Sequence, residues 1–409
     1  MKDKKYDLIV IGSGAAGIMA ALTAAKRGFS VIILEKLSFI SAKLKATGGG
    51  KCNLTNTLNN EEFMEHFKSN GRFMRDALNE FDSKKLVKFM EDIGVKTHAP
   101  DGFRVFPISH SSSTIIKALE KELNKLDVKV ECKQKVVSLV LEDKNIKGVK
   151  TLKDEYFADN VIVATGGLGY PKLGAEGDGY KLAKDVGHTI SNVYPAMMPL
   201  KTKERWVSKL KADTISKVQI YINLKKYKKL KAQGDIIFTD NGIRGPVILD
   251  FAREITPLLE KYKEVPLILN LIKGKNQDEL LNLIKEHSTL TVKEIFLKLL
   301  PLNVVEVFLE LINVDKEKKY KQLSGSEKLK LLEIFTKTPL NVIGHDGFEK
   351  AMITRGGVKL KEINPKTMQS KIINGLYFCG EILDIDGPCG GYNLQWSFSS
   401  GYLAGISIC

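Results

Sequence analysis

Asp7-Leu-Ile-Val-Ile-Gly-Ser-Gly-Ala-Ala-Gly17 is an apolar run of parallel-strand character that ends in a GxGxxG glycine turn. An Ala-rich segment closed by Gly28 follows and predicts a helix. Val31–Leu34 then predicts a second strand, which ends at Glu35. A strand, a glycine turn, a helix, a strand and an acid in this order predict a Rossmann-type dinucleotide-binding unit.

Each residue of this fingerprint has a physical role. Gly12 permits the tight turn, Gly14 lets backbone amides approach a pyrophosphate, and Gly17 lets helix and strand pack closely. The helix N-terminus holds the phosphates through its free N–H groups and its dipole. Glu35 follows Gly17 by 18 residues and suits the ribose hydroxyls. A carboxylate here disfavours a 2′-phosphate, so the fingerprint predicts FAD or NAD.

Three further segments favour a flavin. They are Thr47–Asn56 with its triple glycine, the strand Val161–Ala164 followed by Thr-Gly-Gly, and Gly375–Asp384, which precedes a helix expected to begin near Gly390–Asn393. The triple glycine is also compatible with an ordinary flexible loop. No second GxGxxG follows a strand, so NADH or NADPH is expected to act only as a transient electron donor.

At these motifs the chain resembles the bacterial flavoprotein family of aminoacetone-oxidase-like and bile-acid Δ4,6-reductase-like proteins. The matching stretches are GSGAAG at Gly12–Gly17, GGGKCNLTN at Gly48–Asn56, VIVATGG at Val161–Gly167, FTDNGIRGP at Phe238–Pro246, ITRGGV at Ile353–Val358 and GLYFCGEILDIDGPCGGYNLQWSFSSG at Gly375–Gly401. Four places depart from the usual family pattern and concern the substrate side of the site: the segment Ser41–Lys43, Lys51, Asn241 and Arg244.

The resemblance implies an α/β fold with a Rossmann-type FAD-binding domain that is split in sequence, an inserted β-rich domain and a small helical domain. The expected boundaries are 1–191 and 355–409 for the FAD-binding domain, 192–269 for the β-domain, 270–337 for the helical domain and 338–354 for a return through the β-domain. Fingerprint and resemblance together predict FAD contacts from Gly12, Ser13, Gly14, Ala15, Ala16, Gly17, Glu35, Lys36, Lys43, Gly49, Gly50, Lys51, Cys52, Asn53, Leu54, Thr55, Val136, Val137, Ala164, Thr165, Gly166, Gly380, Glu381, Asp384, Gly391, Tyr392, Asn393 and Leu394.

The middle of the chain carries patterns of its own. Val218–Ile222, Asp235–Phe238 and Pro246–Leu249 predict short strands, whereas Leu and Ile at spacings of three and four between Asp278 and Phe335 predict helices. A cleft where such pieces join is the expected place for a substrate.

The charge of the chain raises the question of an anionic partner. Its 409 residues carry 63 Lys and Arg against 48 Asp and Glu, a net charge of +15, but only eight of the basic residues are Arg. Two runs, Lys225–Lys231 and Lys316–Lys321, place lysines beside tyrosine, which suits phosphate contacts with base stacking. They also suit a solvated hairpin tip and a solvated helix end. The predicted RNA contacts are Lys225, Lys226, Tyr227, Lys228, Lys229 and Arg244.

The number and spacing of cysteine and histidine residues limit the metal and disulfide chemistry that the chain can carry. Five Cys without a Cys-x-x-Cys pair and six His predict neither a disulfide framework nor a metal site. No window of 18 apolar residues is present, so we expect a cytoplasmic protein without a membrane span.

The chemistry open to this chain is flavin oxidoreduction. Cys389 and Cys52 are the candidate proton donors, because a thiol is mostly protonated at pH 7, and Tyr392 and Asn393 are candidate hydrogen-bond donors to flavin or substrate. The resemblance implies aminoacetone oxidation, reduction of a steroid enone, or reduction of uridine to dihydrouridine in 23S ribosomal RNA. The sequence-based hypothesis is an NAD(P)H-fed reduction of an activated C=C in that RNA. The alternatives are a small-molecule enone reductase or amine oxidase, and a flavin-bound RNA-binding factor without turnover. The oligomeric state stays open.

Overall fold

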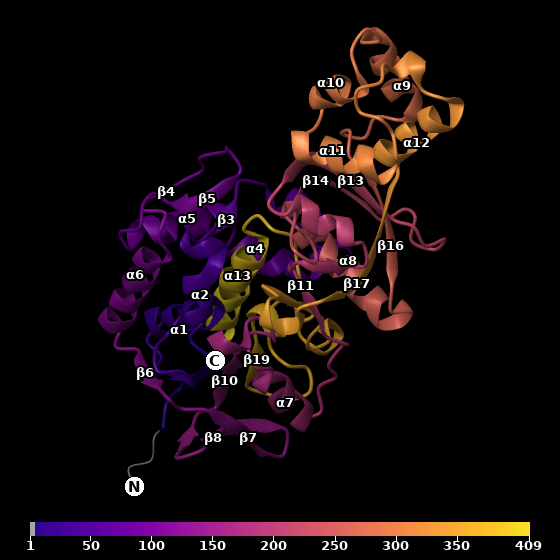
Figure 1. Cartoon of the computed structure of the whole chain (residues 1–409). Helices are drawn as coiled ribbons and strands as arrows, with labels where there is room; N and C mark the ends of the chain where they lie inside the picture. The colour runs from indigo at the N-terminus through magenta and orange to yellow at the C-terminus, as the bar shows by residue number, and fades with distance from the viewer. Residues whose placement is uncertain (1–4) are drawn as a thin grey trace. The chain divides into compact units, whose positions relative to one another are not determined.

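The computed structural model describes residues 5–409. The chain divides into two compact units (Figure 1). The first comprises the chain up to Pro195 and from Ala351 onward, and the second comprises Ala196–Lys350. Each unit has its own hydrophobic core. In the described part of the chain, no helix is both long enough and apolar enough to cross a bilayer.

A five-stranded parallel sheet forms the centre of the first unit. Its strands, in order across the sheet, are β19 (Leu376–Phe378), β10 (Asn160–Val163), β1 (Leu8–Ile11), β2 (Val31–Glu35) and β6 (Lys129–Cys132). The middle strands are apolar and buried along their length, as expected of a sheet covered on both faces. The predicted Rossmann-type fold is confirmed, and β19 brings the C-terminal segment into the same sheet.

Two helices pack closely against each other beside this sheet (Figure 1). They are α1 (Ala15–Lys26) and α13 (Tyr392–Ser407). A Cβ atom on Gly401 would stand 2.2 Å from the Ala16 carbonyl oxygen, and one on Gly405 would stand 2.5 Å from that of Ala20. Both pairs ascend in the same direction, so the helices run parallel and their N-termini point the same way.

Shorter elements complete the first unit. Helices α2 to α7 span Ala42–Ala46, Asn60–Glu65, Arg75–Glu80, Ser83–Asp92, Ser112–Lys125 and Asp178–Asp185. Two antiparallel sheets contain β3 (Thr55–Asn56), β5 (Arg104–Pro107) and β4 (Thr97–His98), and β7 (Val136–Glu142), β8 (Asn145–Thr151) and β9 (Glu155–Phe157). Strands β11 (Tyr194–Ala196) and β18 (Ile353–Arg355) pair where the chain passes between the units.

The second unit is a closed barrel with helices. The barrel strands, in order, are β12 (Leu200–Thr202), β15 (Gly242–Arg244), β14 (Lys231–Phe238), β13 (Thr214–Ile222), β16 (Val265–Asn270) and β17 (Thr338–His345). The helices α9 (Gln277–Glu286), α10 (Val292–Leu297), α11 (Leu302–Leu311) and α12 (Gly325–Thr336) lie where helices are predicted. Barrel and helices contribute to one core.

One predicted strand is wrong. Pro246–Leu249 begins helix α8 (Pro246–Tyr262). Proline is favoured in the first turn of a helix, where its missing N–H costs no hydrogen bond. The buried residues recur with helical spacing at Val247, Phe251, Ile255 and Leu259, so the period of four decides the element and the four-residue apolar run does not.

Candidate functional site

The three glycines of the turn between β1 and α1 have different surroundings: Gly12 and Gly17 are tightly packed, whereas Gly14 faces open space. A Cβ on Gly12, whose φ is +101°, would stand 2.7 Å from the Ala164 carbonyl oxygen, and one on Gly17 would stand 2.1 Å from the Gly12 carbonyl oxygen. Gly14 has no atom within 4 Å of its added Cβ, and no side chain caps α1 there. The turn therefore leaves space in front of the first-turn amides, which is the cradle a pyrophosphate requires.

Glu35 lies beside this cradle at the end of β2. Its carboxylate accepts hydrogen bonds from Ser13 N at 3.0 Å, from Ser13 Oγ at 2.5 Å and from Leu37 N at 2.8 Å. The acid is thus held at the glycine turn, where a ribose would follow the pyrophosphate. Val136 and Val137 begin β7 on the same side, because Gln134 N donates to the Glu35 carbonyl oxygen at 2.9 Å just before that strand.

Lys36, a predicted cofactor ligand, lies in an ion-pair network. Its Nζ is 2.7 Å from Glu176 Oε2 and 2.5 Å from Asp178 Oδ2, and Lys135 Nζ is 3.0 Å from Asp178 Oδ1. Burial opposes ionisation of Asp178, but the hydrogen bonds from the two lysines hold its pKa below the usual range. The charge of Lys36 is therefore neutralised by protein carboxylates.

The chain after β10 returns to the glycine turn. Ala164 contacts Gly12, and Gly166 has a left-handed φ of +72°. Thr165 Oγ1 is buried and has no hydrogen-bond partner among the described residues. Buried hydroxyls are normally paired, so an unpaired one here fits a site that a polar ligand completes.

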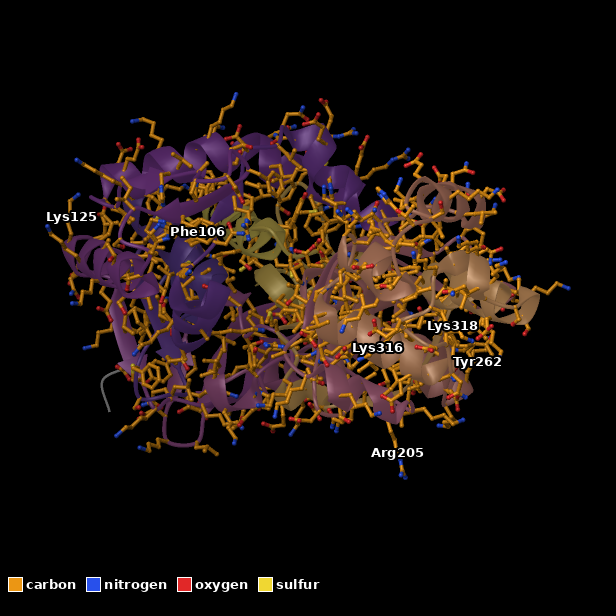
Figure 2. The ribbon with its side chains drawn as sticks, turned by 45° about the horizontal axis from the view of Figure 1, so that its top comes forward. Phe106, Lys125, Arg205, Tyr262, Lys316 and Lys318 are labelled. Carbon is orange, nitrogen blue, oxygen red and sulfur yellow. The ribbon has the colours of Figure 1, made fainter. Side chains whose placement is uncertain are left out.

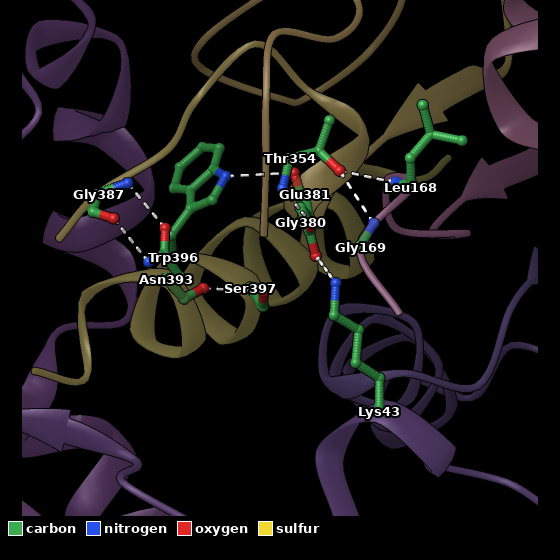
Figure 3. A network of polar contacts seen from close by, with 10 residues as sticks. All are labelled: Lys43, Leu168, Gly169, Thr354, Gly380, Glu381, Gly387, Asn393, Trp396 and Ser397. Atoms are coloured by element: carbon green, nitrogen blue, oxygen red, sulfur yellow. Dashed lines mark hydrogen bonds and ion pairs between the residues drawn. The ribbon is translucent and has the colours of Figure 1, made fainter. Parts of the chain in front are cut away.

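A polar network joins this return to the C-terminal segment (Figure 3). Thr354 Oγ1 accepts from Leu168 N at 2.7 Å and from Gly169 N at 3.2 Å. Glu381 Oε1 accepts from Thr354 N at 2.9 Å, and Glu381 Oε2 lies 2.6 Å from Lys43 Nζ. Four sequence-distant segments are therefore held together at predicted cofactor ligands.

The motifs GGGKCN and CGGYN also meet. Asn53, with its side-chain amide assigned so that every neighbour is satisfied, accepts from Gly391 N at 3.0 Å and donates to Thr55 O at 2.9 Å. Leu54 N donates to Val105 O at 2.9 Å. A Cβ on Gly391 would stand 2.5 Å from the Thr55 carbonyl. The N-terminus of α13 is therefore fixed on β3.

The triple glycine forms a run of left-handed backbone that residues with a Cβ atom rarely adopt. Gly48, Gly49 and Gly50 all have left-handed φ, at +57°, +65° and +89°. An added Cβ on Gly49 or Gly50 would meet nothing within 4 Å, and the neighbouring Lys51 is exposed. The loop therefore offers open backbone beside the buried Cys52.

The two helix N-termini define the span of the site. Gly401, which contacts Ala16, is nine residues beyond the start of α13, whereas Ala16 is one residue beyond the start of α1. Eight extra residues at about 1.5 Å each place the first turn of α13 about 12 Å beyond that of α1. Two parallel helix dipoles so spaced fit an elongated dinucleotide with a pyrophosphate at one and an electron-rich ring at the other.

The remaining C-terminal ligands support this arrangement. Gly380 approaches α1, where its Cβ would stand 2.9 Å from Ala16 Cβ, and its carbonyl oxygen accepts from Trp396 Nε1 at 3.3 Å. Asp384 Oδ2 accepts from Ser191 Oγ at 2.6 Å. Leu394 is half-buried in the first turn of α13.

The candidate thiols differ in environment. Cys52 is fully buried, and burial raises its pKa to about 11. Cys389 is half-buried and directly precedes Gly390 in the loop before α13. A proton donor has to reach the substrate, so Cys389 is the better placed of the two.

Tyr392 and Asn393 begin α13. Tyr392 is 3% exposed and packs its ring against Phe63 and His66 at centroid distances of 5.0 and 4.7 Å. Asn393 accepts from Gly387 N at 2.7 Å and donates to Gly387 O at 2.9 Å, which fixes the loop that carries Cys389. The contact of the exposed His66 with Tyr392 could not be predicted, because nothing in the local sequence around His66 pairs it with α13. The described residues hold no cluster of three or more metal-ligating side chains.

The residues predicted to contact RNA lie in the second unit. Lys225–Lys229 form the tip of the β13–β14 hairpin, whose last pair is Tyr221 with Lys231. Arg244 is exposed on β15.

The glycine turn, the acid after β2 and the second helix N-terminus define a dinucleotide-binding protein of the flavoenzyme type. The profile of the HI0933-like protein Rossmann domain matches residues 6–407, and the chain belongs to that family.

The comparisons with individual proteins agree with this class. The chain is 31% identical over 405 residues to a 3-dehydro-bile acid delta(4,6)-reductase of Clostridium scindens, covering 97% of each. It is 29% identical over 404 residues to a ribosomal RNA dihydrouridine synthase of Haemophilus influenzae, covering 98% of each. It shares the fold of 3-ketosteroid delta1-dehydrogenase from Sterolibacterium denitrificans, with a TM-score of 0.56 and 12% identity over 99% of both chains. The family is one of FAD-type oxidoreductases.

Proposed function

We propose that the protein is an FAD-dependent, NADH- or NADPH-fed reductase of an activated C=C, and that its substrate is a uridine in large-subunit ribosomal RNA. The observation that carries the FAD assignment is the pair of parallel helix N-termini offset by about 12 Å along the helix axes, one behind the open Gly14 and the other fixed by Asn53. FAD, when bound, supplies a two-electron carrier.

The chain's own residues bind and orient the cofactor and deliver a proton to the substrate. The first turn of α1 receives the pyrophosphate, and Glu35 accepts from the ribose. The N-terminus of α13 stabilises negative charge that develops on the ring bound before it. Cys389, held by the Asn393 contacts to Gly387, delivers the proton to the substrate carbon.

Relatives support the reaction type more strongly than the substrate. The names of the bile-acid reductase and of the dihydrouridine synthase both describe saturation of a double bond, and each protein matches nearly the whole chain. The net charge of +15 and the lysine-rich hairpin support the RNA substrate. The greater identity to the bile-acid reductase favours a steroid-type enone as the second candidate.

One experiment distinguishes the candidate substrates and reactions. The protein is purified with its bound flavin, reduced anaerobically with NADH or NADPH, and mixed with unmodified ribosomal RNA, with a steroid enone or with aminoacetone. We expect RNA to accelerate flavin reoxidation and to acquire dihydrouridine. Acceleration by the enone alone would show that the substrate is a small-molecule enone and not RNA. Acceleration by aminoacetone alone would show that the reaction is amine oxidation. Purification without any flavin would reject the whole assignment.

A further inference from the structure

The two lysine runs of the second unit differ in how their charges are neutralised. In the helical run, Lys316 Nζ lies 2.8 Å from Glu306 Oε1, and Lys318 Nζ lies 3.3 Å from Glu327 Oε1. Hydrogen bonds from Lys293 and Lys316 lower the pKa of Glu306 to about 2. Two of the four lysines of this run are therefore neutralised by carboxylates of the protein, whereas no ion pair with a described residue is formed by Lys319 or Lys321. Figure 2 labels Lys316 and Lys318 together with Tyr262 of the same unit.

The hairpin run has no such partners. Within residues 5–409, no carboxylate lies in ion-pair distance of Lys225, Lys226, Lys228 or Lys229, and all four side chains are exposed. Four uncompensated charges on adjacent residues repel one another, so their placement costs free energy unless an anion meets them.

The hairpin tip is nevertheless ordered. Leu224, Tyr227 and Leu230 alternate with the lysines and pack against the barrel core. Tyr227 N donates to Leu224 O at 2.8 Å, and Leu230 N donates to Tyr227 O at 2.8 Å. Because every third residue of the tip is anchored on the core, the intervening lysines extend into solvent from an ordered backbone.

The end of α8 adds an aromatic surface to the tip. Tyr262 is 38% exposed, and its ring lies 6.3 Å from that of Tyr227 in a T-shaped contact. Lys261 Nζ stands 5.0 Å from the Tyr262 ring centroid. The neighbouring Glu264 is neutralised by Lys203 at 3.3 Å. Lysines around an exposed aromatic ring can hold a nucleic-acid backbone while a base stacks on the ring.

We infer that Lys225, Lys226, Lys228 and Lys229, with Tyr227, Tyr262 and Lys261, form an RNA-docking surface, here named the hairpin surface. It binds the phosphates of the ribosomal RNA substrate and stacks an unpaired base on Tyr262. The inference rests on the proposed RNA substrate, and it assigns docking to the hairpin run, whose lysines have no ion-pair partner among the described residues, and not to the partly neutralised helical run.

The test compares two variants that lose the same charge. One is Lys225→Gln/Lys226→Gln/Lys228→Gln/Lys229→Gln. The matched control is Lys117→Gln/Lys121→Gln/Lys144→Gln/Lys153→Gln, which removes four exposed lysines of the first unit that likewise form no ion pair with any described residue. Affinity for an unmodified large-subunit ribosomal RNA transcript is measured across salt concentrations, and thermal melting checks folding.

We expect the hairpin variant to lose roughly five- to eightfold in affinity at 0.1 M salt for each lysine that contacts phosphate, with a salt slope reduced by up to about three. Tyr262→Ala should lose roughly five- to 150-fold, and Tyr262→Phe should retain affinity. Equal losses in the hairpin variant and the control would overturn the inference, because net charge alone would explain both. Binding of anionic phospholipid vesicles instead of RNA would also overturn it.

RNA-dependent flavin reoxidation is followed separately on the same proteins. Turnover of RNA with affinity unchanged in the hairpin variant would reject the hairpin surface and leave the proposed function intact. Loss of affinity in the hairpin variant, with no turnover by the wild-type protein, would retain the surface and reject the function. If the proposed function and the hairpin surface are both correct, the hairpin variant should have a raised KM for RNA and an unchanged kcat.

Discussion

Gly401 of α13 lies directly against Ala16 of α1, so closely that a Cβ on Gly401 would stand 2.2 Å from the Ala16 carbonyl oxygen. Since Ala16 lies in the first turn behind the glycine fingerprint, this contact sets where the second helix begins relative to the pyrophosphate cradle. The last and first segments of the chain are thereby coupled through backbone, which cannot move aside as a side chain does.

Gly401→Ala should therefore both destabilise the first unit and weaken FAD binding. The added methyl group forces the helices apart, and such overpacking costs typically about 1–3 kcal/mol of unfolding free energy. Thermal melting of the apoprotein and flavin titration measure the two effects. Gly325→Ala in α12 is the control, because its Cβ would meet nothing within 4 Å and stability should be unchanged or slightly raised. Equal melting of wild type and Gly401→Ala would contradict the contact.

Gly14→Ala separates cofactor binding from stability. Its φ of −74° and ψ of −178° suit alanine, and the new methyl group enters open space, so the apoprotein should melt within about 0.5 kcal/mol of wild type. The methyl group would occupy the pyrophosphate cradle, so FAD affinity should fall at least tenfold by fluorescence titration. Gly17→Ala, whose Cβ would stand 2.1 Å from the Gly12 carbonyl oxygen, should unfold more easily even without FAD. Unimpaired FAD binding by Gly14→Ala would place the pyrophosphate elsewhere.

The fold around these glycines was predictable because local pattern and burial agree there. The strand before Gly12, the strand ending at Glu35 and the helix after Gly391 form where they are predicted. The strand predicted at Pro246–Leu249 is wrong because a four-residue apolar window does not distinguish a period of two from one of 3.6. The longer window to Tyr262 contains the helical period.

The contacts of the candidate site depended on information that linear sequence lacks. Nothing near Asn53 indicates that it holds Gly391, and nothing near His66 indicates that it stacks on Tyr392. The two lysine runs have similar sequences, and the placement of Glu306 and Glu327 beside Lys316 and Lys318 distinguishes the partly neutralised run from the unpaired one.

Thr354→Val should destabilise the network behind the cofactor ligands. Thr354 is 1% exposed, and its Oγ1 accepts from the amides of Leu168 and Gly169, which valine leaves unpaired. Buried unpaired amides cost about 1–3 kcal/mol each, so the chemical-denaturation midpoint should fall clearly. Thr354→Ser retains the oxygen and should recover most of the loss. A Thr354→Val protein that melts like wild type, or a Thr354→Ser protein that recovers none of the loss, would contradict a stabilising role of these hydrogen bonds.

Cys52 should make the stability of the protein fall in alkali. Burial raises the pKa of its thiol to about 11, whereas the same thiol in the unfolded chain ionises near 9.0. The unfolded state therefore loses its proton first as the pH rises, and the stabilisation present below about pH 9 is lost between about pH 9 and 11. Each pH unit in that window removes at most about 1.4 kcal/mol. Melting temperatures measured from pH 8 to 11 test this.

Cys52→Ala isolates this contribution, because Cys379 is also buried and its pKa is also raised by burial. The alanine variant should be less stable than wild type at pH 8, since a buried sulfur is lost, but the difference between the two proteins should shrink as the pH approaches 11. Iodoacetamide at pH 8 should modify the half-buried Cys389 before Cys52 in the native protein, as peptide mapping would show. A constant stability difference across the whole pH range, or faster alkylation of Cys52 than of Cys389, would contradict the burial of this thiol and restore Cys52 as the candidate proton donor.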